Sequence, residues 1–360
     1  MIYVEGYSLI TAIGETANKS AHRLKNYTYK IEKLDNKTKY YKIPNIKQLE
    51  YYDIIEKTIR DAIKDAELSE ESLKEAALFI GTSSAKLPLN EMHAINSGEL
   101  LKDIHIDEVT DIIAKRTGIG GFKTIISTAC TSSSNALIQA KEMIESGLID
   151  KAIVVGIELY NELSIRGFES FMLLSKDKIK PFDKNRDGII LGEAVSAIVL
   201  GKNESCFELA GGAIKVDTSS ITAPTPENLT IVMDKAIRSA NISAQDIIAI
   251  KTHSTATRQN DEAEAKGIHL IFHKKIPQIV TLKPYIGHTM GACGTNELVL
   301  LLAAMRQGFI PKNIYFESMD SECMIVPSTD ETIARRGYYL LNYFGFGGNN
   351  SSIVLKYKGE

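Results

Sequence analysis

Apolar runs that lack strict alternation are the feature that most constrains how this chain can fold. A strand with one face in water alternates apolar and polar residues, whereas a strand covered on both faces does not. The runs lie at residues 77–80, 124–128, 152–156 and 194–200, and again at 247–251, 278–283, 338–343 and 353–357. They predict an α/β protein whose strands are covered on both faces.

The order of the predicted elements repeats along the chain. A strand, a helix and two further strands occur over residues 124–200, and the same order occurs over residues 278–357. The second of these helices, at residues 295–307, is so apolar that we expect it to be buried. The repeat predicts two similar α/β halves fused face to face, residues 1–202 and 203–360, without a flexible linker.

Composition excludes several classes of function. The chain has 360 residues and a formal net charge of −3, which gives no reason to expect nucleic acid or a membrane as partner. Its four cysteines show no CxxC spacing, so we expect neither a zinc site nor a disulfide framework. The N-terminus does not resemble a signal peptide, and no apolar run reaches membrane-spanning length. We therefore expect a cytoplasmic location.

Cys130 is the first candidate catalytic residue. It lies in Thr128-Ala129-Cys130-Thr131-Ser132, between a predicted strand and a helix-forming run at residues 135–146. A thiol at a helix start lies near free backbone N–H groups and the positive end of the helix dipole. Both favour the thiolate, so we expect a lowered pKa and a nucleophilic sulfur.

Three further motifs follow predicted strands in the second half. His253 lies in a small, hydroxyl-rich loop that continues through residue 257, and His288 precedes the buried helix. The third motif, Gly345-Phe346-Gly347-Gly348, allows close approach of the backbone and positive φ. In an acyl-transfer site such a loop can supply a backbone N–H group to an oxyanion.

Together these motifs resemble those of the β-ketoacyl-acyl carrier protein synthases, which are condensing enzymes of the thiolase fold. The family pattern is Thr-Ala-Cys-x-Ser, then His-x-Thr-x-Thr, then Lys-x-x-x-x-Gly-His, and finally Gly-Phe-Gly-Gly, and all four occur here in that order. The run from Pro181 to Gly188, followed by Gly192-Glu193, is also similar to a family segment. The resemblance covers nearly the whole chain.

The resemblance implies a fold and an activity. The fold would be the five-layered α-β-α-β-α thiolase fold. The activity would be that of an acyltransferase, a 3-oxoacyl-acyl-carrier-protein synthase, which joins an acyl thioester to malonyl-acyl carrier protein in a decarboxylative Claisen condensation. No metal and no other cofactor is implied, because phosphopantetheine arrives on the acyl carrier protein. A homodimer is implied, and a heterodimer with a ketosynthase-like subunit is an open alternative.

The resemblance also implies roles for individual residues. Cys130 would carry the acyl group, and the imidazole N–H groups of His253 and His288 would stabilise the enolate that forms on loss of CO2. The N–H groups of Cys130 and Phe346 would form an oxyanion hole. The remaining implied residues are Phe344 and Gly345 in the gating loop, Lys283 and Glu297 as a charged pair behind the second histidine, Thr255 and Thr257 at the phosphopantetheine arm, and Asp261 closing the histidine loop.

Physical chemistry is consistent with this division of roles. A thiolate is both a good nucleophile and a good leaving group, so one residue can accept and release acyl chains. Neutral histidines suit the stabilisation of an enolate, and a nearby Lys⁺ would help to keep them neutral.

Several motifs have simpler interpretations. Asp183-Lys184-Asn185-Arg186-Asp187-Gly188 imitates an EF-hand loop, but Ala194 stands where the twelfth-position Glu belongs, so we expect a structural turn. His269 and His273 are spaced like metal ligands, but a solvated helix face is the better interpretation. Cys293 stands where the family carries small residues, and we expect it to serve close packing.

Some departures from the family pattern bear on the pathway. Residues 81–124 form a shorter segment than in the family, and Ser254 and Arg258 replace the usual Gly and Pro. They favour a specialised fatty-acid, polyketide or aryl-polyene-like pathway over housekeeping elongation. Two other functions stay open: a chain-length-factor-like partner subunit of another ketosynthase, and an acyltransferase that releases no CO2.

Overall fold

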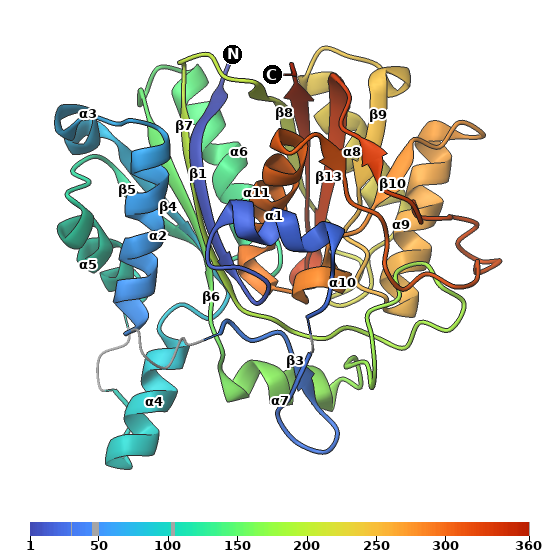
Figure 1. Ribbon diagram of the computed structural model, residues 1–360, viewed down its shortest axis with the longest axis horizontal. Helices are drawn as coiled ribbons and strands as arrows, with labels where there is room; N and C mark the ends of the chain where they lie inside the picture. Colours follow the sequence, from blue (N-terminus) through green and yellow to red (C-terminus); the bar gives the residue numbers. More distant parts are fainter. Residues whose placement is uncertain (30, 45–49, 102–104, 360) are drawn as a thin grey trace.

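A computed structural model describes residues 1–29, 31–44, 50–101 and 105–359 (Figure 1). Its main feature is a mixed sheet of ten strands. The first half of the chain provides β1 (Tyr3–Thr11), β4 (Ala77–Gly81), β5 (Lys123–Ile126), β6 (Ala152–Glu158) and β7 (Ala194–Gly201). The second half provides β8 (Phe207–Val216), β9 (Ile247–Lys251), β10 (Gln278–Val280), β13 (Gly337–Phe344) and β14 (Asn349–Tyr357). Two small ribbons pair β2 (Glu32–Lys33) with β3 (Lys39–Tyr40), and β11 (Phe309–Ile310) with β12 (Thr332–Ile333).

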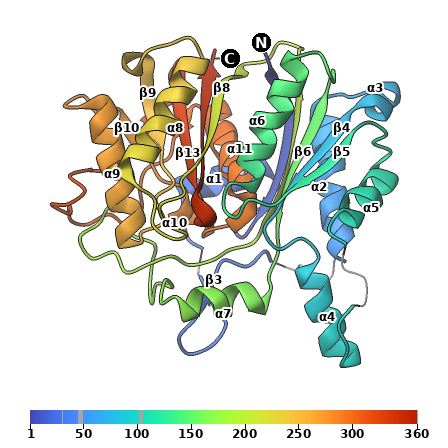
Figure 2. The ribbon, with the colours of Figure 1, turned by 180° about the vertical axis from the view of Figure 1, so that it is seen from behind.

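The two five-stranded halves of the sheet share one topology. Read outward from the middle, the order is β1-β7-β6-β4-β5 on one side and β8-β14-β13-β9-β10 on the other. In each half the first three strands are antiparallel and the last two join in parallel. A single residue pair, Tyr3 with Glu208, connects β1 to β8. The halves therefore meet along one narrow seam, close to which both chain termini lie (Figures 1 and 2).

The helices complete a layered arrangement. They are α1 (Ala17–Lys25), α2 (Tyr51–Asp65), α3 (Glu70–Glu75), α4 (Leu87–Ser97), α5 (Glu108–Thr117), α6 (Ser132–Glu145), α7 (Glu162–Ser170), α8 (Pro226–Ser239), α9 (Arg258–Phe272), α10 (Lys283–Ile286) and α11 (Cys293–Arg306). Helices α6 and α11 lie between the two halves of the sheet, while α2 and α5 cover one outer face and α8 and α9 the other (Figure 2). Among the described residues, no helix is both long enough and apolar enough to cross a bilayer.

Three apolar clusters hold these layers together. The central cluster packs α6 and α11 against strands of both halves, through residues such as Leu137 and Leu301. The outer clusters pack Ile59 of α2 against the first half and Val232 of α8 against the second. Residues 298–305 of α11 are at most 1% exposed, as the uninterrupted apolar run predicts. The five layers of the thiolase fold, expected from the sequence, are confirmed.

Two sequence expectations about strand ends were wrong, and one strand was not predicted. The strand expected at residues 278–283 ends at Val280, because Lys283–Ile286 forms helix α10 with Pro284 in its first turn. The strand expected at 124–128 ends at Ile126, before the backbone turns into α6. Strand β8 was not foreseen, because Gly211 and Gly212 interrupt its pattern. A Cβ at Gly212 would lie 2.8 Å from the Ile138 side chain on α6, so the strand needs glycine there.

Candidate active site

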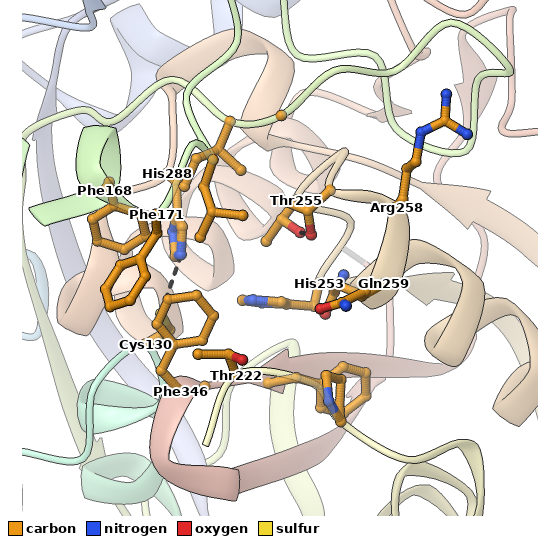
Figure 3. A pocket seen from close by; sticks show the side chains of 18 of the residues that line it. Cys130, Phe168, Phe171, Thr222, His253, Thr255, Arg258, Gln259, His288 and Phe346 are labelled. Carbon is orange, nitrogen blue, oxygen red and sulfur yellow. Dashed lines mark hydrogen bonds between the residues drawn. The ribbon is translucent and has the colours of Figure 1, made fainter. Parts of the chain in front are cut away.

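The three candidate catalytic side chains meet in one place. Cys130 comes from the junction of β5 and α6, His253 follows β9, and His288 lies between α10 and α11. The sulfur of Cys130 and one ring nitrogen of each histidine lie within 4.8 Å of one another. All three side chains line a cavity of about 420 Å³ (Figure 3). The structure therefore brings together the residues that the sequence motifs singled out.

Cys130 is presented by a strained turn. Ala129, directly before it, has φ of +52°, a conformation that L residues seldom adopt. The turn directs the sulfur toward His288, whose Nε2 lies 3.2 Å from Sγ (Figure 3). The backbone N–H groups of Phe346 and of Cys130 itself also reach the sulfur. These are the two N–H groups for which the resemblance implied an oxyanion hole, and that role stays a prediction.

The expected low pKa of Cys130 was wrong. Burial raises the pKa of its thiol to about 11, and the Lys283 charge and the Phe346 N–H group lower it only in part. The helix start is present, but Cys130 is only 6% exposed, and desolvation disfavours the thiolate more than the backbone groups favour it. The resting site therefore holds a thiol beside a neutral imidazole.

Two buried carboxyl groups fix the loop that carries His253. Glu264 accepts hydrogen bonds from the N–H groups of His253 and Ser254, each at 2.8 Å, and burial raises the pKa of Glu264 to about 7. Asp261 accepts one from Ala256 at 3.1 Å, so it closes the loop as expected. Ser254 and Ala256 have positive φ, and these bonds hold that conformation.

A buried charge network lies behind the histidines. Glu297 accepts hydrogen bonds from Lys283 at 2.7 Å and from Lys251 at 2.6 Å, and all three side chains are at most 1% exposed. The expected pair of Lys283 and Glu297 is confirmed, but its place differs. Lys283 contacts Nδ1 of His253 at 3.5 Å, so the pair supports the first histidine rather than the second. Two lysines against one glutamate leave a net positive charge here.

Both histidines are neutral in this setting. Burial lowers the pKa of His253 and of His288 well below the usual value, and the Lys283 charge lowers both further. The expectation that a lysine keeps them neutral is confirmed. Because the Lys283 ammonium can only donate, Nδ1 of His253 must accept, and the ring proton of His253 resides on Nε2. The same positive charge makes the site suited to an anion and unfavourable for a metal cation.

Aromatic residues form one wall of the cavity. The ring of Phe346 stacks on Phe168 at 5.7 Å between centroids and meets Phe171 at 6.5 Å (Figure 3). The ring of Phe344 lies 5.8 Å from that of His253. A Cβ at Gly345 would lie 3.2 Å from the Cys130 nitrogen, so the loop approaches the nucleophile closely.

The opposite wall carries hydroxyl groups. Thr255 and Thr257 share a hydrogen bond of 2.9 Å, and both line the cavity. Arg258 and Gln259 lie on the same side (Figure 3). The cavity therefore has one apolar and one polar side.

Of the segments that were interpreted as structural, the EF-hand-like run forms the expected turn, although Arg186, Asp187 and Gly188 in it also line the cavity. Asp183 accepts N–H groups of Asn185, Glu317 and Ser318, and the Arg186 guanidinium pairs with Asp320 and Glu262, so the EF-hand-like run is a turn. The solvated face expected for His269 was wrong in part. His269 is half-buried, and its Nε2 lies 3.0 Å from the Cys323 carbonyl, whereas His273 is exposed.

Sequence reasoning missed three polar residues of the site. Lys251 is the second partner of Glu297, Glu264 holds the His253 loop, and Cys293 touches His288, with 3.0 Å between Sγ and Nδ1. For Lys251 a signal existed, because a lysine that ends a buried apolar strand needs an anionic partner. Cys293 was expected only to pack closely, and its contact with a catalytic histidine depends on tertiary structure.

Comparison with known proteins places the chain in a family. The family model described as "Beta-ketoacyl synthase, N-terminal domain" matches residues 15–205, and that described as "Beta-ketoacyl synthase, C-terminal domain" matches 206–317. A putative mitochondrial 3-oxoacyl-acyl-carrier-protein synthase of Schizosaccharomyces pombe is 29% identical over 335 residues, 82% of this chain and 78% of that protein. The 3-oxoacyl-acyl-carrier-protein synthase 2 of Mycobacterium leprae is 30% identical over 247 residues, 63% of this chain and 59% of that protein.

A solved structure shows the same fold. The ishigamide ketosynthase/chain length factor superposes with a TM-score of 0.89 at 22% identity, over 99% of both chains. The N-terminal family model by itself covers more than half of the present sequence. The chain thus belongs to the β-ketoacyl synthase family.

Proposed function

We propose that this chain is a 3-oxoacyl-acyl-carrier-protein synthase that extends an acyl group by decarboxylative condensation. The observation that carries the proposal is the convergence of a thiol, two neutral imidazoles and two backbone N–H groups on one cavity. Family relatives named as such synthases support it. The arrangement suits a reaction that needs one nucleophile and several preorganised donors.

The first step transfers an acyl group to Cys130. The sulfur attacks the thioester carbonyl of an acyl-carrier protein, forming a new C–S bond. The N–H groups of Cys130 and Phe346 stabilise the oxyanion. The old C–S bond then breaks, and the Cys130 proton passes to the departing pantetheine thiolate. His288, with Nε2 at 3.2 Å from Sγ, is placed to donate a hydrogen bond to the sulfur and to hold it in line with the carbonyl.

The second step forms the carbon–carbon bond. Loss of CO2 from a malonyl thioester leaves an enolate with its charge on the thioester oxygen. His253 and His288 present their Nε2–H groups to this oxygen, and the positive network of Lys251, Lys283 and Glu297 favours the charge. The enolate carbon attacks the acyl-Cys130 carbonyl, the C–S bond breaks, and the Cys130 thiolate regains a proton from water. Each donor of this kind is worth about 2.7–4 kcal/mol in a dry site.

The substrates would arrive on acyl carrier protein. We propose that Thr255 and Thr257 contact the phosphopantetheine arm and that no metal or other resident cofactor takes part. We also propose that the chain functions with a second ketosynthase-like chain, and a homodimer is the first expectation. Native mass spectrometry of the purified protein distinguishes a homodimer from a chain that needs a different subunit.

Intact-mass analysis tests the first step. Incubation with acyl-carrier protein should add one acyl mass to the wild type and none to Cys130→Ala, whereas Cys323→Ala, which removes a buried thiol outside the site, should acylate normally. An equal adduct on wild type and Cys130→Ala would refute the proposal. Wild-type acylation without CO2 release from malonyl-carrier protein would instead identify an acyltransferase that does not condense.

A further inference from the structure

We propose that Cys293 is a positioning residue that donates its S–H to Nδ1 of His288 and so holds the His288 proton on Nε2. The inference rests on the proposed function for its catalytic consequence, while the tautomer itself can be measured without any turnover. Cys293 is the first residue of α11, five residues after His288, and it is fully buried. It is the residue that sequence reasoning assigned to close packing.

The His288 ring bridges two thiols. Its Nδ1 lies 3.0 Å from the Cys293 sulfur, and its Nε2 lies 3.2 Å from the Cys130 sulfur. A neutral imidazole has one N–H donor and one acceptor nitrogen, so the partner at one nitrogen decides what the other can do. The partner at Nδ1 therefore determines whether Nε2 can donate toward the cavity.

The hydrogen bonds around Cys293 give the direction of donation. Asn296 donates from Nδ2 to Oγ1 of Thr289 at 3.2 Å, and Thr289 Oγ1 donates to the Cys293 sulfur at 3.6 Å. The sulfur already accepts from Thr289, so its own proton is directed to Nδ1 of His288. Burial also raises the pKa of Cys293, so it stays a thiol and keeps the proton that it donates. The chain of donors runs from Asn296 toward the cavity.

His253 has the same arrangement with another donor. Lys283 occupies Nδ1 of His253 at 3.5 Å, just as Cys293 occupies Nδ1 of His288. Each ring is therefore left with Nε2–H facing the cavity. The difference lies in charge, because the lysine is a cation and the thiol is neutral. Cys293 fixes the ring of His288 without placing another positive charge beside it.

The experiment measures the tautomer of His288 directly. Long-range proton–nitrogen NMR spectra of protein labelled with ¹⁵N-histidine distinguish a protonated from an unprotonated ring nitrogen, and the His288 signals are assigned by their loss in His288→Gln. We expect Nε2–H in the wild type and in Cys293→Ser, which keeps a donor, and a shift toward a mixture of tautomers in Cys293→Ala. Cys323→Ala is the control for loss of a buried thiol.

Kinetics supply the second readout. Cys293→Ala should lower kcat for malonyl-carrier decarboxylation by about tenfold, the size of one hydrogen bond, with KM changed less than about twofold, and Cys293→Ser should restore most of it. A wild type with the proton on Nδ1, or a Cys293→Ala protein with an unchanged His288 tautomer, would overturn the inference. If the wild type shows Nε2–H but no decarboxylation, the proposed function fails while the role of Cys293 in the tautomer stands.

Discussion

The two halves of the molecule have the same strand order but opposite roles in the site. In the first half, the junction after β5 carries the nucleophile Cys130, and in the second half the corresponding junction after β10 carries His288. The loops after β4 and β9 also correspond. The loop after β9 carries His253, whereas the serines after β4 bind the buried carboxylate of Glu158.

The comparison shows that two halves with the same strand order contribute different kinds of side chain to the candidate site. Strand ends from both halves meet around one cavity, so the proposed nucleophile from one half faces the proposed proton donors from the other. Each half also buries a glutamate, but their partners differ. Glu297 pairs with two lysines, whereas in the described part of the chain Glu158 accepts only from hydroxyl and backbone N–H groups, including that of Gly291. The buried lysine pair that we propose for the anionic intermediate thus belongs to the second half.

The largest expected effect separates these two glutamates. Glu297→Gln leaves Lys251 and Lys283 buried without an anion, and it should reduce the free energy of unfolding by about 3–5 kcal/mol. Glu158→Gln loses hydrogen bonds but strands no charge, and it should cost about 1–3 kcal/mol. Urea unfolding followed by circular dichroism measures both. Equal losses would show that the halves do not differ in buried charge.

The next largest effect is a loss of decarboxylation without a comparable loss of acylation. His253→Ala removes one donor to the enolate, so malonyl-carrier decarboxylation should fall about 10²–10³-fold. Acylation of Cys130 should stay within about tenfold, because its oxyanion hole is backbone. His269→Ala, a change on α9, is the matched control. Comparable losses of acylation and decarboxylation would contradict the division of roles between the halves.

A smaller effect concerns the pH dependence of Cys130. Burial raises the pKa of its thiol to about 11, so the reactive thiolate is scarce at neutral pH and increases as pH rises. Alkylation by iodoacetamide should therefore accelerate about tenfold per pH unit between about pH 7 and 9. Peptide mass spectrometry follows the modification at Cys130. A rate that levels off below about pH 8 would show that the helix start outweighs desolvation.

The smallest effect concerns the loop that closes the site. Gly347 has φ of +76°, a conformation in which an L residue is strained. Gly347→Ala should therefore cost about 1 kcal/mol in stability and slow acylation only a few-fold. Gly147→Ala, at φ of +74° on the distant end of α6, is the matched control for backbone strain. A greater loss of acylation in the control would contradict this view of the loop.

Much of the fold could be predicted from the sequence because burial leaves a pattern. The apolar run of α11 and the covered strands of both halves follow from which residues must avoid water. Strand β8 was not predicted because two glycines interrupt its run of apolar residues. The end of β10 was predicted too far along the chain because a short helix with Pro284 in its first turn follows the strand. The local sequence does not show which side chain will pack so closely against the backbone that only glycine fits there, as Ile138 does at Gly212.

For the candidate site, the sequence predicted which residues take part, but not their pKa values or their contacts with one another. The motifs identified Cys130, His253, His288 and the Phe346 loop, because their residue types at strand ends carry distinctive chemistry. The pKa of Cys130 was predicted in the wrong direction, because desolvation depends on everything packed around the sulfur. The contacts of Lys283 with His253 and of Cys293 with His288 join separate parts of the fold, and motif spacing does not show which atoms face each other.

One single-turnover measurement tests the central claim, that Cys130 holds the acyl group while the histidines of the other half drive decarboxylation. Acyl-Cys130 protein is mixed with malonyl-carrier protein labelled with ¹³C in the free carboxyl group, and the products are analysed by mass spectrometry. The account predicts one labelled CO2 for each acyl group lost from Cys130 and an unlabelled 3-oxoacyl-carrier product two carbons longer. Loss of the acyl group with the label retained on the carrier would contradict it.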